Sequence, residues 1–296
     1  GHPPAPPGRG LARGADAGGR RTLPGGNALR AELEFARRVA RQAGDVVRGY
    51  FGQSELTVDM KGWADPVTAA DRAAEAHIRA EMAKQYPEDG IYGEEEGLAQ
   101  SRSGRVWLVD PLDGTANFAG GMPIFAVCIT LLAGDPAEPV VNVTYDPIRD
   151  ESFEVVKGEG ARLNGTPIRA SAAGDLAGAL IHIAFPRDRR LWLAATELAR
   201  CITQVAPHAR NIGSSALAQA WVACGRLHAH ARVSAGEFDI VGGNLMIAEA
   251  GGVVTDLQGQ PFDDSRGGLL TAAPRMHRLL LDLNLAKCLD GVLEEE

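Results

Sequence analysis

The chain has 296 residues, of which 45% are hydrophobic and 23% charged, as in a globular protein with one large domain or two of ordinary size. Its formal net charge of −8 argues against the basic surface that general nucleic-acid binding needs, so we expect no nucleic-acid partner. No apolar run approaches the roughly 18 residues of a membrane span. We therefore expect no membrane partner and a cytoplasmic location.

The cysteines are few and scattered. They are Cys128, Cys201, Cys224 and Cys288, and no two of them form a CxxC pair. This spacing predicts neither a zinc site nor a disulfide framework.

Residues 1–29 differ in composition from the rest of the chain. They are rich in Gly, Pro, Ala and Arg, and Asp16 is their only acidic residue. Because they have no periodic apolar face, they cannot bury enough surface to offset the entropy lost on ordering. They also lack the apolar core of about 7–15 residues that a secretory signal has. We predict a disordered extension or an expression remnant, with an Arg-rich transit peptide as the alternative.

Residues 30–165 are predicted to form an N-terminal α+β half. Apolar residues recur at helical spacing from Ala31 to about Phe51, and a second helix is expected between Thr68 and Pro87. Strand-like runs follow near Ile91 and at 106–109, 125–132, 140–145 and 152–156. Consecutive strands without intervening helices favour an antiparallel sheet with the helices packed on one face.

Residues 166–296 are predicted to form a C-terminal α/β half that completes the active site. Here strands and helices alternate. The expected elements are a strand at 180–184, a helix at 191–199, a helix from Ser214 or Ser215, a helix at 239–250 and a strand at 252–255. We expect a cleft between the two halves.

The stretch from Trp107 to Thr115 carries the strongest chemical signal. A buried strand, Val106–Val109, is expected to stop at Asp110, and Asp113 follows with Gly114 and Thr115 directly after it. This layout places two carboxylates beside backbone amides that are able to hold an anion. Carboxylates and phosphates repel each other unless divalent cations lie between them. The pattern suggests a metal-dependent phosphatase, although Asp-Pro-x-Asp-Gly also occurs in plain turns.

Three further acidic segments each have an ordinary alternative. Glu94 lies in a run of three glutamates that alone would be a solvated loop. Asp239 precedes an apolar helix and would be its N-cap, with Gly251–Gly252 as the stop. Asp71 follows Thr68 by three residues, as in a capping box.

Taken together and in this order, the four segments resemble the signature of the inositol monophosphatase family, a branch of the lithium-sensitive, magnesium-dependent phosphatases. The matching stretches are 65–71, 93–95, 107–118 and 238–252, with Phe238 where the family usually has Trp. The resemblance implies an α+β fold, a layered αβαβα sandwich of the inositol monophosphatase/fructose-1,6-bisphosphatase type. It also implies a homodimer.

The resemblance further implies a magnesium site with two or three ions. Its ligands would be the carboxylates of Glu94, Asp110, Asp113 and Asp239 and the carbonyl of Leu112. Hard oxygen donors of this kind suit Mg²⁺. Two such ions are able to clamp the attacking and leaving oxygens of an in-line displacement.

The catalytic roles that the resemblance implies fall on three residues. Glu94, together with an Asp71–Thr115 pair, would orient and deprotonate the attacking water. The backbone amides of Gly114 and Thr115, at a helix start, would bind phosphate oxygens. No covalent nucleophile is required. Lys61 corresponds to a region near the family's mobile metal-binding loop, or it is a solvated surface lysine.

Substrate choice is open at this level. Gly213, Ser214 and Ser215 fall where the family lines its substrate pocket, although the two serines would equally cap a helix. Seven residues before Asp239, inositol-specific members often carry a Glu, and here the residue is Arg232. Arg232 would either bind a second anionic group of the substrate or face solvent.

The expected substrate is a small polyol or sugar phosphate such as myo-inositol 1-phosphate. Histidinol phosphate and the bisphosphates fructose 1,6-bisphosphate and phosphoadenosine phosphate are the alternatives. A different class of function also stays open, that of a non-catalytic regulatory or RNA-associated binding protein. The complete set of predicted metal ligands speaks against it.

Overall fold

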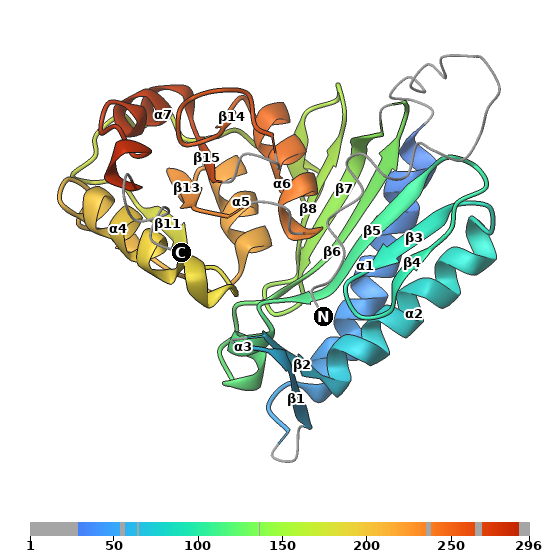
Figure 1. Cartoon of the computed structure of the whole chain (residues 1–296). Coiled ribbons are helices and arrows are strands. Elements are labelled where there is room, and N and C mark those ends of the chain that lie inside the picture. The colour runs from blue at the N-terminus through green and yellow to red at the C-terminus, as the bar shows by residue number, and fades with distance from the viewer. Residues whose placement is uncertain are drawn as a thin grey trace.

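The computed structural model describes residues 29–53, 57–63, 65–135, 137–234, 238–263 and 268–289, without the side chains of Phe238 and Asp239. The prediction for residues 1–29 therefore falls outside the described residues, apart from Leu29, which is buried in the core. The described elements stack in alternating helical and sheet layers (Figure 1). This is the layered α+β sandwich that we expected.

The larger sheet has eight strands in the order β10-β9-β8-β7-β6-β5-β3-β4. They are β3 (Gly90–Gly93), β4 (Gly97–Ala99), β5 (Val106–Asp113), β6 (Ala126–Ala133), β7 (Glu138–Asp146), β8 (Glu151–Val156), β9 (Ala161–Leu163) and β10 (Thr166–Pro167). All neighbours pair antiparallel except β3 and β5, which are parallel. The sheet extends through Thr166–Pro167, just past the expected boundary at residue 165.

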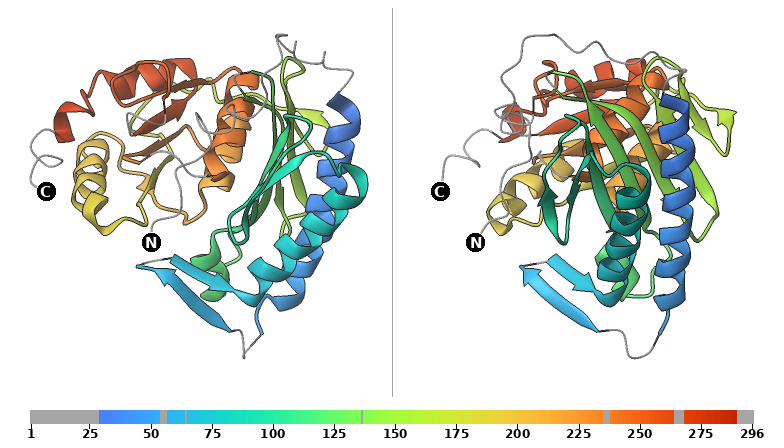
Figure 2. Two further views of the ribbon diagram at one scale, coloured as in Figure 1. Left: turned by 45° about the vertical axis from the view of Figure 1, so that its right-hand side comes forward. Right: turned by 90° about the vertical axis from the view of Figure 1, so that its right-hand side faces the viewer.

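Two helices, α1 (Arg30–Tyr50) and α2 (Ala69–Gln85), cover one face of this sheet (Figure 2). The apolar stripe of α1 is buried against the sheet, with Val39, Ala43 and Val47 fully inaccessible to solvent. This packing explains why the periodic pattern predicted α1 to within a residue at each end. Between the two helices, β1 (Val58–Gly62) and β2 (Asp65–Thr68) pair antiparallel as a separate two-stranded sheet.

Helices cover the opposite face of the large sheet as well. These are α5 (Ser215–Ala223) and α6 (Phe238–Glu249), which contact both sheets and form the middle layer. The helices of the N-terminal half thus pack on one face, as predicted, and helices of the C-terminal half cover the other face.

The smaller sheet has five strands in the order β12-β11-β13-β15-β14. They are β11 (Ile181–Ala184), β12 (Ala209–Arg210), β13 (Ala229–Arg232), β14 (Val253–Thr255) and β15 (Leu269–Ala272). The outer layer consists of α4 (Trp192–Thr203) and α7 (Pro274–Leu281), with the 3-10 turns η2 (Arg189–Leu191) and η4 (Lys287–Leu289). No helix in the described ranges is long and apolar enough to cross a membrane.

Strand β5 does not stop at Asp110, as the sequence suggested, but continues to Asp113. Its pairing with β6 is irregular between Asp110 and Asp113, where the register shifts. An irregularity of this kind turns side chains away from the regular alternation. The strand thus ends at Asp113 instead of Asp110, and Gly114 follows it directly.

One disulfide, Cys201–Cys288, corrects the expectation from cysteine spacing. It joins α4 to η4 across 87 residues of sequence, with the two Cα atoms 6.7 Å apart. So long a separation leaves no local pattern in the sequence. Cys128 and Cys224 take no part in a disulfide.

Candidate active site

The end of β5 holds two of the predicted metal ligands. Asp110 and Asp113 are both buried, with 4% and 6% of their surface exposed. The Oδ1 atom of Asp110 accepts a hydrogen bond of 3.0 Å from the Leu112 amide. Gly114 then takes a positive φ of 94°, where a Cβ would lie 2.9 Å from the Ile124 carbonyl oxygen. Only glycine fits here, and the short helix α3 (Thr115–Ala119) begins directly after it.

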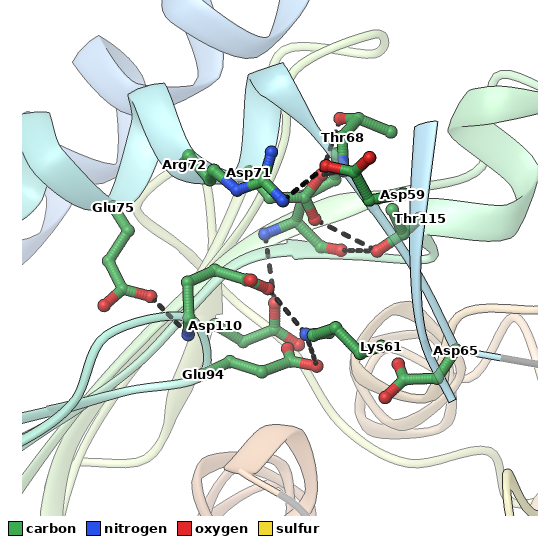
Figure 3. Close-up of polar contacts among 12 residues, drawn as sticks. Asp59, Lys61, Asp65, Thr68, Asp71, Arg72, Glu75, Glu94, Asp110 and Thr115 are labelled. Atoms are coloured by element: carbon green, nitrogen blue, oxygen red, sulfur yellow. Dashed lines mark hydrogen bonds and ion pairs between the residues drawn. The ribbon is translucent and has the colours of Figure 1, made fainter. Parts of the chain in front are cut away.

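Asp71 connects this turn to helix α2. Its Oδ2 accepts hydrogen bonds from the amide and the hydroxyl of Thr68, at 2.8 and 2.6 Å, which completes a capping box. Its Oδ1 accepts a hydrogen bond of 3.1 Å from the Thr115 hydroxyl (Figure 3). Asp71 therefore caps the helix and contacts Thr115 at once. Burial raises the pKa of Asp71, and the hydrogen bonds from Thr68 oppose that shift.

The loop after β3, which carries Glu94, is held in place by the buried carboxylate of Glu75. Glu75, on α2, is fully buried and accepts hydrogen bonds from the amides of Glu95 and Glu96 at 2.8 and 3.0 Å. A Cβ on Gly93 would lie 2.1 Å from Glu75, so the loop packs directly on this carboxylate. The Glu94 side chain is only 14% exposed, and the solvated-loop alternative is wrong for Glu94.

Two cations contact the carboxylate of Glu94. Lys61, on β1, lies 3.3 Å from Glu94 Oε1 and 2.7 Å from Glu95 Oε1 (Figure 3). Arg187, after β11, donates a 2.6 Å hydrogen bond to the same Oε1 atom and lies 3.3 Å from Asp65 Oδ1. Burial disfavours the charged form of Glu94, but the charges of Arg187 and Lys61 outweigh it and lower its pKa to about 2. Lys61 lies on an exposed strand, but its ammonium group is paired with Glu94 and Glu95.

Asp113 joins the two halves of the molecule. The Ser214 hydroxyl donates a hydrogen bond to Asp113 Oδ2, and the Ala216 amide donates another of 3.0 Å. Ser214 is also the N-cap of α5, since its hydroxyl accepts from the Leu217 amide at 3.3 Å. Burial raises the pKa of Asp113 to about 6 even though the hydrogen bonds from Ser214 and Ala216 oppose the shift.

A cavity of about 150 Å³ opens between the β5 end and the smaller sheet. Its lining contains all six of the predicted phosphate- and substrate-binding residues, namely Gly114, Thr115, Gly213, Ser214, Ser215 and Arg232. Arg232 is 2% exposed, so the alternative in which it faces solvent is wrong. It ends β13 and donates a 3.0 Å hydrogen bond to the Ser234 hydroxyl.

Two stacked histidines lie at the cavity, where His182 is part of the lining and His230 packs against it. The Nδ1 atoms of His182 and His230 are 2.7 Å apart, so one ring donates a hydrogen bond to the other. Burial lowers the pKa of His182 to about 3, and the hydrogen bond to Asn211 opposes this while the charge of Arg232 adds to it. The pKa of His230 is also lowered, chiefly by burial. Both rings are therefore neutral near pH 7.

The donor set fits a hard divalent cation by its chemistry. Buried carboxylates that lie close together are costly unless cations neutralise them, and the two cations on Glu94 reflect that demand. The Thr115 hydroxyl lies 2.9 Å from the Leu112 carbonyl as well as 3.1 Å from Asp71, so its single proton is shared between these two acceptors. Among the described side chains, no group of three or more His, Cys, Asp or Glu residues is close enough to hold a metal ion. The side chain of Asp239, the fourth predicted carboxylate, lies outside them.

Sequence reasoning missed several residues of the cavity wall. These are Pro66, His182, Phe185, Arg187 and Asn211. Apart from Pro66, which lies in the matching stretch 65–71, they come from short strand ends and loops and belong to no motif. One signal was available, because β11 and β13 are parallel and the residues that follow the carboxyl ends of parallel strands line ligand sites.

The sandwich, with buried carboxylates at the end of β5 and a helix start beside them, defines a protein of a phosphatase fold. The chain belongs to the inositol monophosphatase family, whose model matches residues 29–286. It is 37% identical to the Nus factor SuhB of Pasteurella multocida, over 84% of this chain and 94% of that protein.

Solved structures agree with this assignment. The extragenic suppressor protein suhB of Bartonella henselae has a TM-score of 0.81 and 33% identity, over 87% of this chain and 99% of that one. The inositol monophosphatase of Anabaena sp. PCC 7120 has a TM-score of 0.76 and 32% identity, over 88% and 97%. Membership of this family suggests phosphatase activity and, as is general in the family, dependence on magnesium.

Proposed function

We propose that the protein is a Mg²⁺-dependent phosphomonoesterase that hydrolyses a small polyol or sugar phosphate such as myo-inositol 1-phosphate. One observation carries the proposal. Thr115 lies at the start of α3 in the cavity wall and, through its hydroxyl, contacts Asp71 at 3.1 Å. A phosphate seated at that helix start would therefore lie beside a hydroxyl–carboxylate pair able to hold a water molecule.

The metal ligands in this proposal are Glu94, Asp110, Asp113, Asp239 and the carbonyl of Leu112. When bound, two or three Mg²⁺ ions would supply charge neutralisation and a water of lowered pKa. The amides of Gly114 and Thr115 would hold phosphate oxygens, with their N–H groups already aligned at the helix start. Asp71 would accept a hydrogen bond from the Thr115 hydroxyl, whose oxygen would in turn accept one from the attacking water. This pair, together with Glu94, would orient the water and take up its proton.

The other side of the cavity would bind the alcohol part of the substrate. Gly213, Ser214 and Ser215 offer polar groups there, although Ser214 already donates to Asp113. Arg232 adds a buried positive charge at a position where inositol-specific relatives carry a Glu. A positive charge here would suit a second anionic group, so bisphosphates and histidinol phosphate are kept as the alternative substrates.

The test is phosphate release from a substrate panel, measured as kcat/KM with Mg²⁺ and with Li⁺ added. The panel contains myo-inositol 1-phosphate, histidinol phosphate, fructose 1,6-bisphosphate, phosphoadenosine phosphate and β-glycerophosphate. Magnesium-dependent hydrolysis that lithium inhibits is the expected result. A clear preference for histidinol phosphate would overturn the substrate class, and no release from any member would overturn the enzyme.

A second candidate function is favoured by the names of the relatives. Several curated relatives carry the name Nus factor SuhB, which suggests a regulatory role. A regulatory protein of this kind would have protein or nucleic-acid partners, and the net charge of −8 favours a protein partner. Mg²⁺-dependent turnover by the wild type but not by Asp110→Asn separates this candidate from the enzyme.

We also propose that the protein forms a homodimer in the cytoplasm, as the family resemblance implies. Sedimentation velocity at micromolar concentration distinguishes a dimer of about twice 31.2 kDa from a monomer.

A further inference from the structure

Arg187 is a cation that reaches across the molecule to a predicted metal ligand. Its Nη1 atom lies 2.6 Å from Glu94 Oε1 and 3.3 Å from Asp65 Oδ1. Asp65 begins β2, so one guanidinium joins the smaller-sheet half, the two-stranded sheet and the loop after β3. The side chain is 43% exposed and also lines the cavity with Asp113 and Thr115.

Arg187 contacts the carboxylate of Glu94, which is a metal ligand in the proposed function. Mg²⁺ binds carboxylate oxygens at about 2.0–2.1 Å and demands near-octahedral geometry, so the metal and a guanidinium at 2.6 Å compete for the same lone pairs. The guanidinium stays charged at every accessible pH. Its contact with Glu94 is therefore always available when no metal is bound.

Lys61 provides an internal comparison. It contacts the same Glu94 oxygen, but at 3.3 Å, and its closer partner is Glu95 at 2.7 Å. The Lys61 ammonium can leave Glu94 and keep its second partner. Arg187 has the shorter contact to Glu94 and the longer contact to Asp65. Of the two cations, Arg187 is thus the stronger rival of a metal.

We propose that Arg187 competes with the divalent cation for Glu94, so that it lowers the metal affinity of the site and moves off Glu94 when the metal binds. The inference rests on the proposed function only in taking Glu94 as a metal ligand. Its consequence is that metal entry also releases the link between Glu94 and the segment after β11. Metal occupancy and the contact between the halves are thereby coupled.

The test is isothermal titration of the whole, metal-stripped protein with Mn²⁺ and with Mg²⁺, in the absence of any substrate. Arg187→Gln removes the rival charge and is expected to lower the metal Kd by about five- to tenfold, the worth of one partly exposed charged hydrogen bond. Lys61→Gln is expected to lower the Kd by about twofold. Arg187→Lys keeps a positive charge and stays within about twofold of the wild type.

The matched control is Arg189→Gln, which removes an exposed arginine two residues further on and should leave the Kd unchanged. A Kd that is unchanged or higher in Arg187→Gln overturns the competition, since a residue that merely positions Glu94 would weaken metal binding when lost. If the wild type binds neither cation at millimolar concentration, the proposed function fails together with this inference. If the wild type binds the metal and Arg187→Gln has the same Kd, the inference about Arg187 is wrong while the proposed function stands.

Discussion

The two halves of the molecule build the cavity in different ways. In the N-terminal half, acidic groups are held by several local contacts, as in the hydrogen bonds from Thr68 and Thr115 to Asp71. In the C-terminal half, the cavity is lined by polar side chains that emerge from an apolar sheet, such as His182 and Arg232. Their hydrogen-bond partners lie in the same half, whereas the acidic groups of the N-terminal half connect separate elements around the end of β5. We infer that the N-terminal half sets the chemistry and the C-terminal half sets the selection of substrate.

The largest effect is expected from Asp110→Asn in the N-terminal half. A metal contributes several kcal/mol to transition-state stabilisation, so weakening its binding should lower kcat/KM by on the order of a thousandfold. Circular dichroism should be unchanged, because the substitution is nearly isosteric. Glu96→Gln is the control, since Glu96 is 57% exposed in the neighbouring loop. Turnover near the wild-type level in Asp110→Asn would refute the metal mechanism.

Thr115→Val separates the two roles of Asp71. It removes the 3.1 Å hydrogen bond to Asp71 but leaves the capping box of α2 intact. Kcat should fall by about a hundredfold, in the range of general-base contributions, with little change in melting temperature. Thr68→Val should leave kcat near the wild-type value but lower the free energy of unfolding by about 1 kcal/mol, because the helix cap is lost. Measurements of kcat and melting temperature on both variants test whether the two roles of Asp71 are separate. Equal losses of activity in the two variants would contradict the separation.

Arg232→Gln tests whether the C-terminal half selects the substrate. If Arg232 binds a second anion, kcat/KM should fall about tenfold for the bisphosphates, the worth of one charge-assisted hydrogen bond. The values for myo-inositol 1-phosphate should stay the same or rise. Arg232→Lys serves as the charge-conserving control. An equal change for every substrate in the panel would mean that Arg232 supports the fold and does not read the substrate.

The smallest expected effect is a dependence of stability on pH that comes from the histidine pair. Burial lowers the pKa of His182 to about 3, so the folded ring stays neutral while the unfolded ring takes up a proton below about pH 6.5. The free energy of unfolding should therefore fall as pH decreases, by about 1 kcal/mol between pH 6 and 5 for His182. Urea denaturation of His182→Gln should show a shallower slope. The exposed His208→Gln should keep the wild-type slope, and equal slopes in all three proteins would exclude the effect.

The sequence allowed much of the N-terminal half to be predicted because its signals are local. The helix α1, the capping box at Thr68 and the strands β3 and β5–β8 follow from periodicity and short motifs, whereas the short strands β1, β2, β4, β9 and β10 were not predicted. The chain's membership of the inositol monophosphatase family confirmed the resemblance that those motifs carried. The extension of β5 to Asp113 was missed, because Pro111 and Gly114 are turn residues whose local preference the sheet pairing overrides.

The C-terminal half was less predictable because its contacts join residues that are distant in sequence. The contact of His182 with His230 spans two parallel strands, and the disulfide spans 87 residues. Arg187 meets Glu94 across 93 residues, and no pattern within either segment indicates that meeting. The sequence indicated that Arg232 falls at a substrate-facing position, but it did not show that the side chain is buried, because burial depends on how the layers pack.

Helix α2 sets the spacing between two parts of the candidate site. Asp71 and Glu75 are four residues apart and so lie on the same side of the helix, one turn from each other. The first contacts Thr115 and the second contacts the loop that carries Glu94. The spacing between the proposed water-binding groups is thus set by the pitch of one helix. An inserted or deleted residue between them would rotate one contact away from the other, and point substitutions that leave the helix in register would not.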